Sequence, residues 1–323
     1  MLRILNVEPY RFSEKARSIY RQLGEYVEKT LSREALLREI EVYDILVMRF
    51  DHCVDEALLK RASKLKVVAT NVTGPDRVDA DALKHRAIRL ICLKDQPDFM
   101  NKIYASAEHT WALLMALVRK IPAAVFSVLN SQWDRNQFMG NELHGKAMGI
   151  LGLGRNGKKV AEYATVFGMR VCGYDIQGHS DADTIQCFDS LEDLLSVSDV
   201  LSIHLPLSEQ TRHMINGHCL ATMPKGAFLV NTSRGAIVHE PALLEALESG
   251  HLAGAALDVI EGEWDSKSRQ ENRLIAYAKT HDNLIVTPHI GGVTVEAWEQ
   301  TEVFIAEQVR SYITATKAPR HED

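Results

Sequence analysis

The chain has 323 residues, of which 46% are hydrophobic and 25% are charged, and its formal net charge is −6. This length exceeds the usual size of one domain and provides material for a large core, so we expect two domains. Acidic and basic residues are mixed along the whole chain. No basic face for nucleic acid is therefore expected, which argues against DNA and RNA as partners.

Five cysteines lie far apart in the sequence: Cys53, Cys92, Cys172, Cys187 and Cys219. There is no CxxC pair and no nearby histidine that would complete a zinc site, so no metal is expected. The amino terminus lacks the apolar core and cleavage site of a signal peptide, and no apolar run approaches membrane-spanning length. The sequence predicts a reduced, cytoplasmic protein that does not bind membranes.

Short β-rich runs alternate with helical patterns from the start of the chain. This alternation predicts a parallel sheet flanked by helices. A second strand–helix series begins at Lys146, and the last segment has apolar residues at helical spacing, which predicts an amphipathic helix that could pack on either domain. The expected strands of the first series are residues 3–7, 45–48, 67–70 and 90–93, and the expected helices are residues 13–23, 55–62, 79–86, 101–120 and 294–315.

The segment AMGILGLGRNGKKVAEYA, residues 147–164, combines an apolar strand, a G-x-G-x-x-G turn and a helix. In such a turn Gly152 permits the tight bend, Gly154 lets the backbone approach a pyrophosphate, and Gly157 lets the helix pack on the strand. Asp175 stands at the end of the following strand, where a carboxylate binds the adenosine ribose and repels a 2′-phosphate. The pattern predicts a dinucleotide site that favours NAD over NADP.

The same turn nearly matches the phosphate-binding loop G-x-x-x-x-G-K-[ST] of nucleoside triphosphatases. The match fails at its last position, because Lys159 has no hydroxyl group for magnesium. A triphosphatase would also not need Asp175 at the tip of the next strand. We therefore interpret the turn as a dinucleotide site.

Three later apolar segments end in residues that suit acid–base chemistry. Arg234, Glu263 and His289 each follow such a segment. Reduction of a 2-oxo acid requires a cation for the carboxylate, a proton donor near neutral pH and a group that orients this donor, and these three residue types meet the requirements. Taken singly, Arg234 could be a surface salt-bridge partner, His289 a core histidine and Glu263 a solvated acid. The interpretation therefore depends on the three together.

For other polar residues the sequence gives weaker evidence of a role in the site. His204, at a strand tip before Pro206, is interpreted as part of the cofactor cleft rather than as a base. Glu108 and His109 lie side by side near the start of the long apolar helix, and we interpret them as structural.

Together these motifs resemble the D-isomer-specific 2-hydroxyacid dehydrogenase family over nearly the whole chain. The resemblance rests on the glycine-rich turn with Asp175 and on VLSIHLPL at 200–207, MPKGAFLVNTSRG at 223–235, LDVIEGE at 257–263 and TPHIGG at 287–292. The position of the turn agrees with it, since malate, L-lactate and short-chain dehydrogenases begin with their nucleotide fold, whereas this turn appears only after residue 145.

The resemblance implies an α/β fold of two doubly wound parallel-sheet domains, in which a Rossmann NAD domain is inserted into a flavodoxin-like catalytic domain. The catalytic domain would comprise residues 1–97 and 291–323, and the NAD domain residues 98–290. A homodimer is also implied, and the segment around Trp133 is a candidate contact.

The resemblance also implies roles for individual residues. His289 would be the acid/base, Glu263 its partner and Arg234 the substrate anchor. The implied substrate-binding residues are Arg49, Thr73, Gly74 and Arg234. The implied cofactor-binding residues are Gly152, Gly154, Arg155, Asn156, Gly157, Asp175, His204, Pro206, Thr232, Ser233, Arg234, Asp258, His289 and Gly291.

The expected function is hydride transfer between the nicotinamide of NAD and C2 of a small D-2-hydroxy or 2-oxo acid. The alternative is an NAD(H)-sensing binding protein, similar to the corepressors of the family, with the same fold. Two departures from the family pattern bear on the substrate: Trp264 replaces the usual proline after Glu263, and Pro75 stiffens the carboxylate loop. Because Phe50 and Asp51 are expected to face the cleft, we expect an uncharged or apolar C3 group rather than a phosphate.

Overall fold

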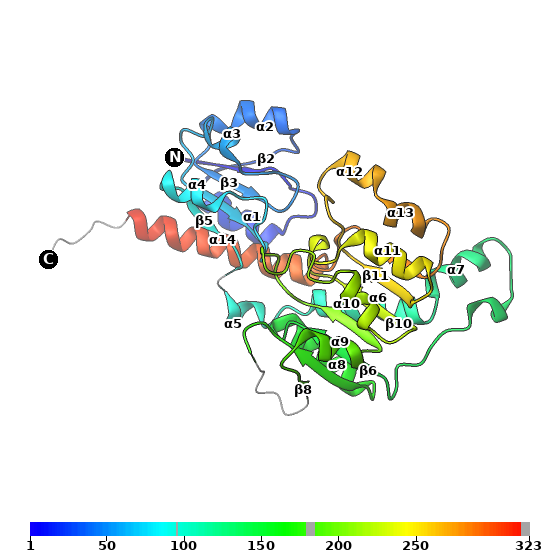
Figure 1. The fold of residues 1–323 in the computed structure, drawn as a ribbon. Helices are drawn as coiled ribbons and strands as arrows, with labels where there is room; N and C mark the ends of the chain where they lie inside the picture. Colours follow the sequence, from blue (N-terminus) through cyan, green and yellow to red (C-terminus); the bar gives the residue numbers. More distant parts are fainter. Residues whose placement is uncertain (95, 179–184, 318–323) are drawn as a thin grey trace. The chain divides into compact units, whose positions relative to one another are not determined.

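The computed structural model describes residues 1–94, 96–178 and 185–317. The chain forms two compact units, and unit 2 is inserted into unit 1 along the sequence (Figure 1). Unit 1 comprises Met1–Lys102 and Val293–Asp323, and unit 2 comprises Ile103–Gly292. The chain thus leaves unit 1 after Lys102 and returns to it after Gly292, whereas the sequence suggested crossings after residues 97 and 290.

Unit 1 is built on a five-stranded parallel sheet with the strand order β2-β1-β3-β4-β5. Its central strands β3 and β4 are runs of mainly aliphatic residues that are buried along their whole length, as expected of parallel strands covered on both faces. The parallel sheet predicted from the sequence is confirmed. The strands are β1 (Leu2–Asn6), β2 (Gly24–Glu28), β3 (Ile45–Met48), β4 (Val67–Thr70) and β5 (Arg89–Ile91), and the α-helices are α1 (Glu14–Leu23), α2 (Arg33–Glu39), α3 (Glu56–Leu59), α4 (Ala80–His85), α5 (Pro97–Met100) and α14 (Val295–Lys317).

Four helices of unit 1 begin at polar side chains that stand directly before them. Ser13, Ser32, Asp55 and Asp79 each accept a hydrogen bond from a backbone N–H in the first turn of α1, α2, α3 and α4, respectively. These caps satisfy amide groups that have no partner inside the helix. The local sequence therefore determines where these helices start.

The edge strand β2 is missing from the sequence-based prediction. Its residues GEYVE are intermediate or exposed, so no buried face distinguishes the strand in the sequence. It pairs with β1 alone, and a Cβ at Gly24 would lie 2.1 Å from the carbonyl oxygen of Leu2. The glycine thus allows the chain to leave α1 and join β1 at once.

Helix α14 belongs to unit 1 and packs against α1. Its Glu302 is 2% exposed and forms an ion pair with Arg49, which is 7% exposed. One oxygen of Glu302 accepts from Arg49 Nε at 3.1 Å, and the other accepts from the N–H of Ser13 at 2.6 Å. The ring of Trp298 lies 4.0 Å from the guanidinium carbon. Arg49 is thus directed into the interior of unit 1, and these contacts do not support the substrate-binding role expected from the sequence.

Unit 2 is built on a seven-stranded parallel sheet with the order β12-β11-β10-β9-β6-β7-β8. From β6 the chain first adds strands on one side and then returns to add β9 on the other. The carboxyl edge beside β6 is therefore the switch point at which such sheets bind ligands. The strands are β6 (Ala147–Leu151), β7 (Arg170–Tyr174), β8 (Gln186–Cys187), β9 (Val200–Ile203), β10 (Ala227–Asn231), β11 (Leu252–Leu257) and β12 (Leu284–Val286).

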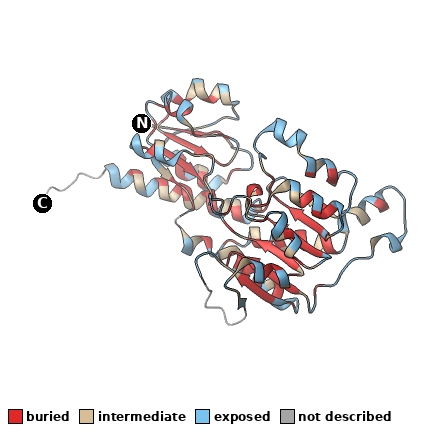
Figure 2. Cartoon of the chain, in the orientation of Figure 1, coloured by how far each residue is buried: buried red, intermediate tan, exposed pale blue. Residues whose placement is uncertain are grey.

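Helices cover both faces of this sheet, and buried residues concentrate in the strands of both units (Figure 2). The long apolar helix expected at residues 101–120 is α6, and its residues Leu113, Leu114 and Leu117 belong to the core of unit 2. The α-helices of unit 2 are α6 (Ala105–Val118), α7 (Ile121–Leu129), α8 (Arg155–Val166), α9 (Leu191–Val197), α10 (Gly217–Thr222), α11 (Glu240–Glu248), α12 (Ser266–Glu271) and α13 (Arg273–Ala278).

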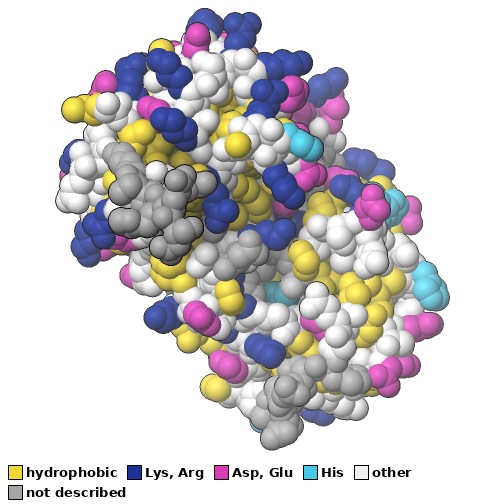
Figure 3. Space-filling view, turned by 90° about the vertical axis from the view of Figure 1, so that its left-hand side faces the viewer, with side chains coloured by type: hydrophobic (Ala, Val, Ile, Leu, Met, Phe, Trp, Pro, Cys, Tyr) yellow, Lys and Arg dark blue, Asp and Glu magenta, His cyan; other side chains and the backbone are white. Residues whose placement is uncertain are grey.

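Two surface properties bear on possible partners. In the described part of the chain, no single helix has both the length and the apolar character needed to span a membrane, and α6 and α7 meet these criteria only when joined across a bend of 63°. On the face shown in Figure 3, lysine and arginine side chains are interspersed with aspartate and glutamate.

We predict that Glu302→Ala destabilises the protein by about 3–5 kcal/mol, because the substitution leaves the Arg49 guanidinium buried without its partner. Burial raises the pKa of Glu302 although the hydrogen bond from Arg49 lowers it, so the pair only partly compensates the loss of solvation. The double substitution Arg49→Met with Glu302→Leu should therefore cost less than the single one. Urea unfolding followed by circular dichroism measures both.

Glu299→Ala is the matched control on the same helix. Glu299 pairs with Lys15, but the two side chains are 45% and 75% exposed. An exposed pair contributes about 1 kcal/mol or less. Equal losses for Glu299→Ala and Glu302→Ala would contradict a special role of the buried pair.

Candidate active site

The predicted site residues of unit 2 lie in the turns and loops that follow its strands, at one edge of the sheet. Hydrogen bonds tie each of these loops to its neighbour. The N–H of His204 donates to the carbonyl of Leu151 at 2.7 Å, and Ser233 Oγ donates to the carbonyl of Ile203 at the same distance. Further along, the N–H of Asp258 donates to the carbonyl of Asn231 at 2.9 Å. The edge is therefore a connected scaffold that fixes the side chains above it.

The glycine-rich turn joins β6 to α8 and has the geometry that the sequence predicted. Gly152 has φ +96°, and a Cβ at Gly157 would lie only 2.0 Å from the carbonyl oxygen of Gly152. A Cβ at Gly154, in contrast, would meet no described atom within 4 Å. Gly154 is the N-cap of α8, a helix of 12 residues, so backbone amides and the helix dipole favour an anion at this open place. The turn fits a pyrophosphate.

Asn156, in the first turn of α8, adds a second sign of a ligand. Its Oδ1 is buried and has no hydrogen-bond partner among the described residues. Buried polar atoms are normally paired. The side chain is therefore suited to bind a donor that the chain itself does not supply.

Asp175 follows β7 and reaches back to the glycine-rich turn. Its Oδ2 accepts from the N–H of Leu153 at 2.7 Å, and its Oδ1 accepts from the N–H of Gln177 at 2.9 Å. A carboxylate oxygen has two lone pairs, so each can accept one further hydrogen bond. The carboxylate is thus held beside the turn while retaining the capacity to bind ribose hydroxyls.

Two cations of α8 are directed to the start of unit 2. Arg155 Nη1 and Lys159 Nζ donate to the carbonyl of Ile103 at 3.1 and 2.7 Å, and Lys159 also lies 3.7 Å from the centre of the Tyr104 ring. Burial lowers the pKa of both side chains. Lys159 is thus a packing residue, which agrees with the failure of the triphosphatase pattern at this position.

Several predicted cofactor residues have side chains bonded to the scaffold. His204 Nε2 lies 2.8 Å from Ser202 Oγ, and burial lowers the pKa of His204 to about 4, so its ring is neutral at neutral pH. Thr232 Oγ1 lies 2.7 Å from Thr110 Oγ1. Pro206 begins the loop after His204, and its carbonyl accepts from Thr211 Oγ1 at 2.7 Å. These contacts fix the chain at the carboxyl ends of β9 and β10.

Asp258, at the end of β11, is 1% exposed and organises the neighbouring strand end. Its Oδ1 accepts from Thr287 Oγ1 at 2.6 Å and from the N–H of Ile290 at 2.9 Å, and its Oδ2 accepts from the N–H of Gly291 at 2.7 Å. His109 Nε2 lies 3.2 Å from Oδ1. Burial alone would raise the pKa of Asp258, but hydrogen bonds from His109 and Thr287 contribute to holding the pKa below its ordinary value. The loop after β12 is therefore fixed on a charged carboxylate.

His289 stands in this loop and contacts Glu263, another of the predicted catalytic residues. Its Nδ1 lies 2.7 Å from Glu263 Oε1, and the two side chains are 19% and 12% exposed. The N–H of His289 donates to the carbonyl of Asp258 at 2.8 Å, which supports its φ of +55°. Such a backbone conformation is unfavourable for a residue other than glycine and is often retained for function. The contact with Glu263 thus fixes the orientation of the imidazole through Nδ1.

Arg234 follows β10, the strand next to β11. Asn231 Nδ2 donates to the carbonyl of Arg234 at 2.9 Å, which fixes the turn after the strand. A Cβ at Gly235 would lie 2.0 Å from the carbonyl carbon of Ile260, so the Arg234 loop packs directly on the segment that leads to Glu263. Arg234, Glu263 and His289 thus follow three successive strands of the sheet.

Sequence reasoning missed His109 as a site residue. It lies on α6, which packs across β11, and its distance of 149 residues from Asp258 in sequence leaves no local signal. Thr287 stands inside the TPHIGG motif but received no role, although its hydroxyl binds Asp258. The predicted substrate residues Thr73 and Gly74 belong to unit 1 and lie in the loop after β4.

Residues 111–291 match the NAD-binding domain of the D-isomer specific 2-hydroxyacid dehydrogenases. The chain belongs to this family. It is similar to D-3-phosphoglycerate dehydrogenase of Methanocaldococcus jannaschii, with 36% identity over 317 residues that cover 97% of this chain and 58% of the relative. The chain thus spans little more than half the length of this relative. The expected family, fold class and NAD-binding domain are confirmed.

Solved structures of similar chains agree. The TT0316 protein from Thermus thermophilus has 31% identity and a TM-score of 0.85, with 97% of each chain covered. A D-lactate dehydrogenase from Aquifex aeolicus, complexed with NAD and lactic acid, has 27% identity and a TM-score of 0.83, with 97% of this chain and 96% of the other covered.

We predict that Gly154→Ala weakens NADH binding about tenfold or more, because the added methyl group occupies the place where the pyrophosphate approaches the turn. Its effect on the free energy of unfolding should stay below about 1 kcal/mol, since no described atom lies within 4 Å of the new Cβ. Fluorescence titration with NADH and urea unfolding measure the two quantities.

Gly157→Ala and Gly217→Ala are the matched controls. The first should prevent normal folding, because its Cβ would overlap a backbone oxygen, and the second should change neither quantity, because its Cβ would meet only Ala242 at 3.6 Å. Unchanged NADH affinity in a folded Gly154→Ala would refute the assignment of the turn.

Proposed function

We propose that the protein is an NAD-dependent D-2-hydroxyacid dehydrogenase that transfers a hydride between nicotinamide and C2 of a small D-2-hydroxy or 2-oxo acid. The observation that carries the proposal is the His289–Glu263 pair at 2.7 Å, on the same sheet edge as the glycine-rich turn, in a chain of this family. We further propose that Asp175 favours NAD over NADP, since its carboxylate would repel a 2′-phosphate.

In this proposal each catalytic residue has one task. NAD, when bound, supplies the hydride acceptor or donor. His289 Nε2 accepts the proton of the substrate hydroxyl during oxidation and returns it during reduction. Glu263 accepts the N–H of His289 Nδ1, which fixes the tautomer and stabilises the imidazolium by its negative charge. Arg234 holds the substrate carboxylate, because its planar guanidinium matches two oxygens at once.

For the substrate, we propose an acid whose C3 group is uncharged. The ring of Trp264 lies 5.5 Å from that of His289 and offers an apolar wall beside the proposed acid/base. The charge of Arg49 is compensated by Glu302, so this arginine does not offer an uncompensated charge to a phosphate. The second candidate is D-3-phosphoglycerate, which the names of relatives at 36 and 37% identity favour.

One experiment tests the reaction and its substrate. NADH oxidation is measured with pyruvate, hydroxypyruvate and 3-phosphohydroxypyruvate, and we expect turnover with the first two to exceed that with the third. Arg234→Lys should lower kcat/KM by about 30-fold to 1,000-fold although the charge is kept. An ammonium group cannot replace the bidentate contact of the guanidinium with the substrate carboxylate, which is worth about 2–4 kcal/mol.

The controls separate the possible outcomes. Folding and NADH affinity of Arg234→Lys should match those of the wild-type protein. A clear preference for 3-phosphohydroxypyruvate would refute the uncharged C3 group, and a fully active Arg234→Lys would remove Arg234 from the site. NADH binding without turnover of any acid would favour the NAD(H)-sensing binding protein instead.

We also propose that the protein forms a homodimer through α7 and the segment that follows it. This region exposes large apolar side chains, which is typical of an interaction surface. The residues are Ile121 (47% exposed), Val125 (53%), Phe126 (69%), Leu129 (77%), Trp133 (90%) and Met139 (83%).

Analytical ultracentrifugation checks this assembly. We expect a dimer for the wild-type protein and a monomer for the double substitution Phe126→Asp with Trp133→Asp, because two charges would enter an apolar contact. Val166→Asp, on the exposed face of α8, is the control and should stay dimeric. A monomeric wild-type protein would contradict the proposal.

A further inference from the structure

A hollow of about 380 Å³ lies at the carboxyl edge of the unit 1 sheet. It is built entirely from residues of this unit, among them Val7, Leu31, Arg33, Asp51, His52 and Arg77. They follow β1, β2, β3 and β4 or begin α2. After β1 the chain adds β2 on one side of it and then β3 on the other, so the order of the strands reverses at β1. Open parallel sheets bind ligands at such switch points.

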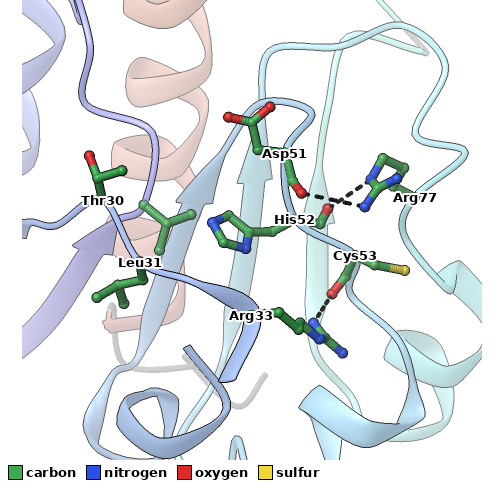
Figure 4. A pocket seen from close by; sticks show the side chains of 8 residues that line it. Thr30, Leu31, Arg33, Asp51, His52, Cys53 and Arg77 are labelled. Carbon is green, nitrogen blue, oxygen red and sulfur yellow. Dashed lines mark hydrogen bonds between the residues drawn. The ribbon is translucent and has the colours of Figure 1, made fainter. Parts of the chain in front are cut away.

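The loop after β3, residues 50–53, is held in place from three sides. Glu8 accepts from the N–H groups of Phe50 and Asp51 at 3.0 and 3.1 Å. Arg33 donates to the carbonyl of Cys53, and Arg77 donates to the carbonyls of Asp51 and His52, both at 3.4 Å (Figure 4). The two arginines are thereby fixed beside the hollow. A site whose groups are already held by the scaffold binds a ligand at a smaller entropic cost.

His52 is the residue that indicates a ligand. It is only 7% exposed, and its imidazole projects into the hollow (Figure 4). Among the described residues its ring forms no hydrogen bond, and its nitrogens are not fully buried, so they are open to a partner in the hollow. Burial lowers the pKa of His52, so the ring is neutral at pH 7 and presents one donor and one acceptor.

The surrounding charges define what could satisfy this ring. Arg33 and Arg77 supply only donors, whereas the exposed carboxylate of Asp51 supplies only acceptors. Glu8 and Asp55 already bind the loop amides and Arg33, respectively. A matching ligand therefore carries an oxyanion for Arg77 and a hydroxyl group that can donate to His52 or Asp51. Val7 and Leu31 add apolar side chains to the lining of the hollow.

We propose that this hollow is a binding site for a small hydroxylated oxyanion, recognised by His52 and Arg77, whereas Arg33 is already paired with Asp55. The residues proposed for hydride transfer, Arg234, Glu263 and His289, belong to unit 2 and are not part of it. The inference therefore does not depend on the proposed reaction. The oxyanion could be a carboxylate or a phosphate, and the two probes below distinguish these sources.

Isothermal titration of the full chain without cofactor tests the site, with glycolate and inorganic phosphate as separate probes. We expect the wild-type protein to bind at least one probe. His52→Phe keeps the ring volume and removes both nitrogens, and it should weaken that binding about tenfold, the order of one hydrogen bond to a charged group. Binding of glycolate alone would identify a carboxylate site, and binding of phosphate alone a phosphate site.

Two further variants keep the test decisive. Arg77→Gln removes the charge of a half-buried lining residue and should also weaken binding about tenfold, so it replaces His52→Phe if that variant does not fold. Arg86→Gln, at an exposed arginine of unit 1 that does not line the hollow, is the control and should change the affinity by less than about twofold. Absence of binding for both probes would overturn the proposal. It would equally be overturned if folded His52→Phe and Arg77→Gln both bound the probe with the affinity of the wild-type protein.

Discussion

The buried carboxylate of Asp258 is the constraint on which the candidate active site depends. An isolated charge at 1% exposure would be strongly unfavourable, but three donors from the segment after β12 and one from α6 surround this carboxylate. The same bonds tie the loop after β12 to the end of β11. His289 is part of that loop, and its left-handed backbone is retained because the carbonyl of Asp258 accepts its N–H.

The hydrogen bonds of Asp258 help to explain why His289 and Glu263 lie only 2.7 Å apart and are largely buried. Both residues follow neighbouring strands, so the spacing of a parallel sheet already brings their backbones together. Gly262, with φ +72°, turns the chain between Asp258 and Glu263 so that the glutamate approaches the ring of His289. The carboxylate of Asp258 thus acts on the loop backbone, and that of Glu263 acts on the imidazole itself. Asp258 and Glu263 therefore have different tasks near His289: Asp258 binds backbone amides of its loop, and Glu263 binds its ring.

The sequence predicts those features of the fold that have a local cause. Glycine spacing determines the turn at Gly152–Gly157, capping residues determine the helix starts of unit 1, and aliphatic runs determine the central strands. The edge strand β2 escaped prediction because an exposed strand lacks a buried face. The contacts of His109 and Arg49 escaped prediction for another reason, since their partners Asp258 and Glu302 are 149 and 253 residues away. Only tertiary packing reveals whether such a residue serves the site or the interior.

The pair of Arg49 and Glu302 also shows how the two parts of unit 1 depend on each other. All five strands of the unit 1 sheet precede unit 2 in the sequence. The partner of Arg49, however, is Glu302, which follows unit 2 in the sequence. Until α14 packs on α1, the guanidinium of Arg49 lacks both Glu302 and the ring of Trp298, so its charge must remain solvated. Unit 1 therefore reaches its final packing only when residues on both sides of the insertion are present. The insertion of unit 2 is tolerated because its two ends join unit 1 at a loop before α6 and at the start of α14, where no strand of the unit 1 sheet is interrupted.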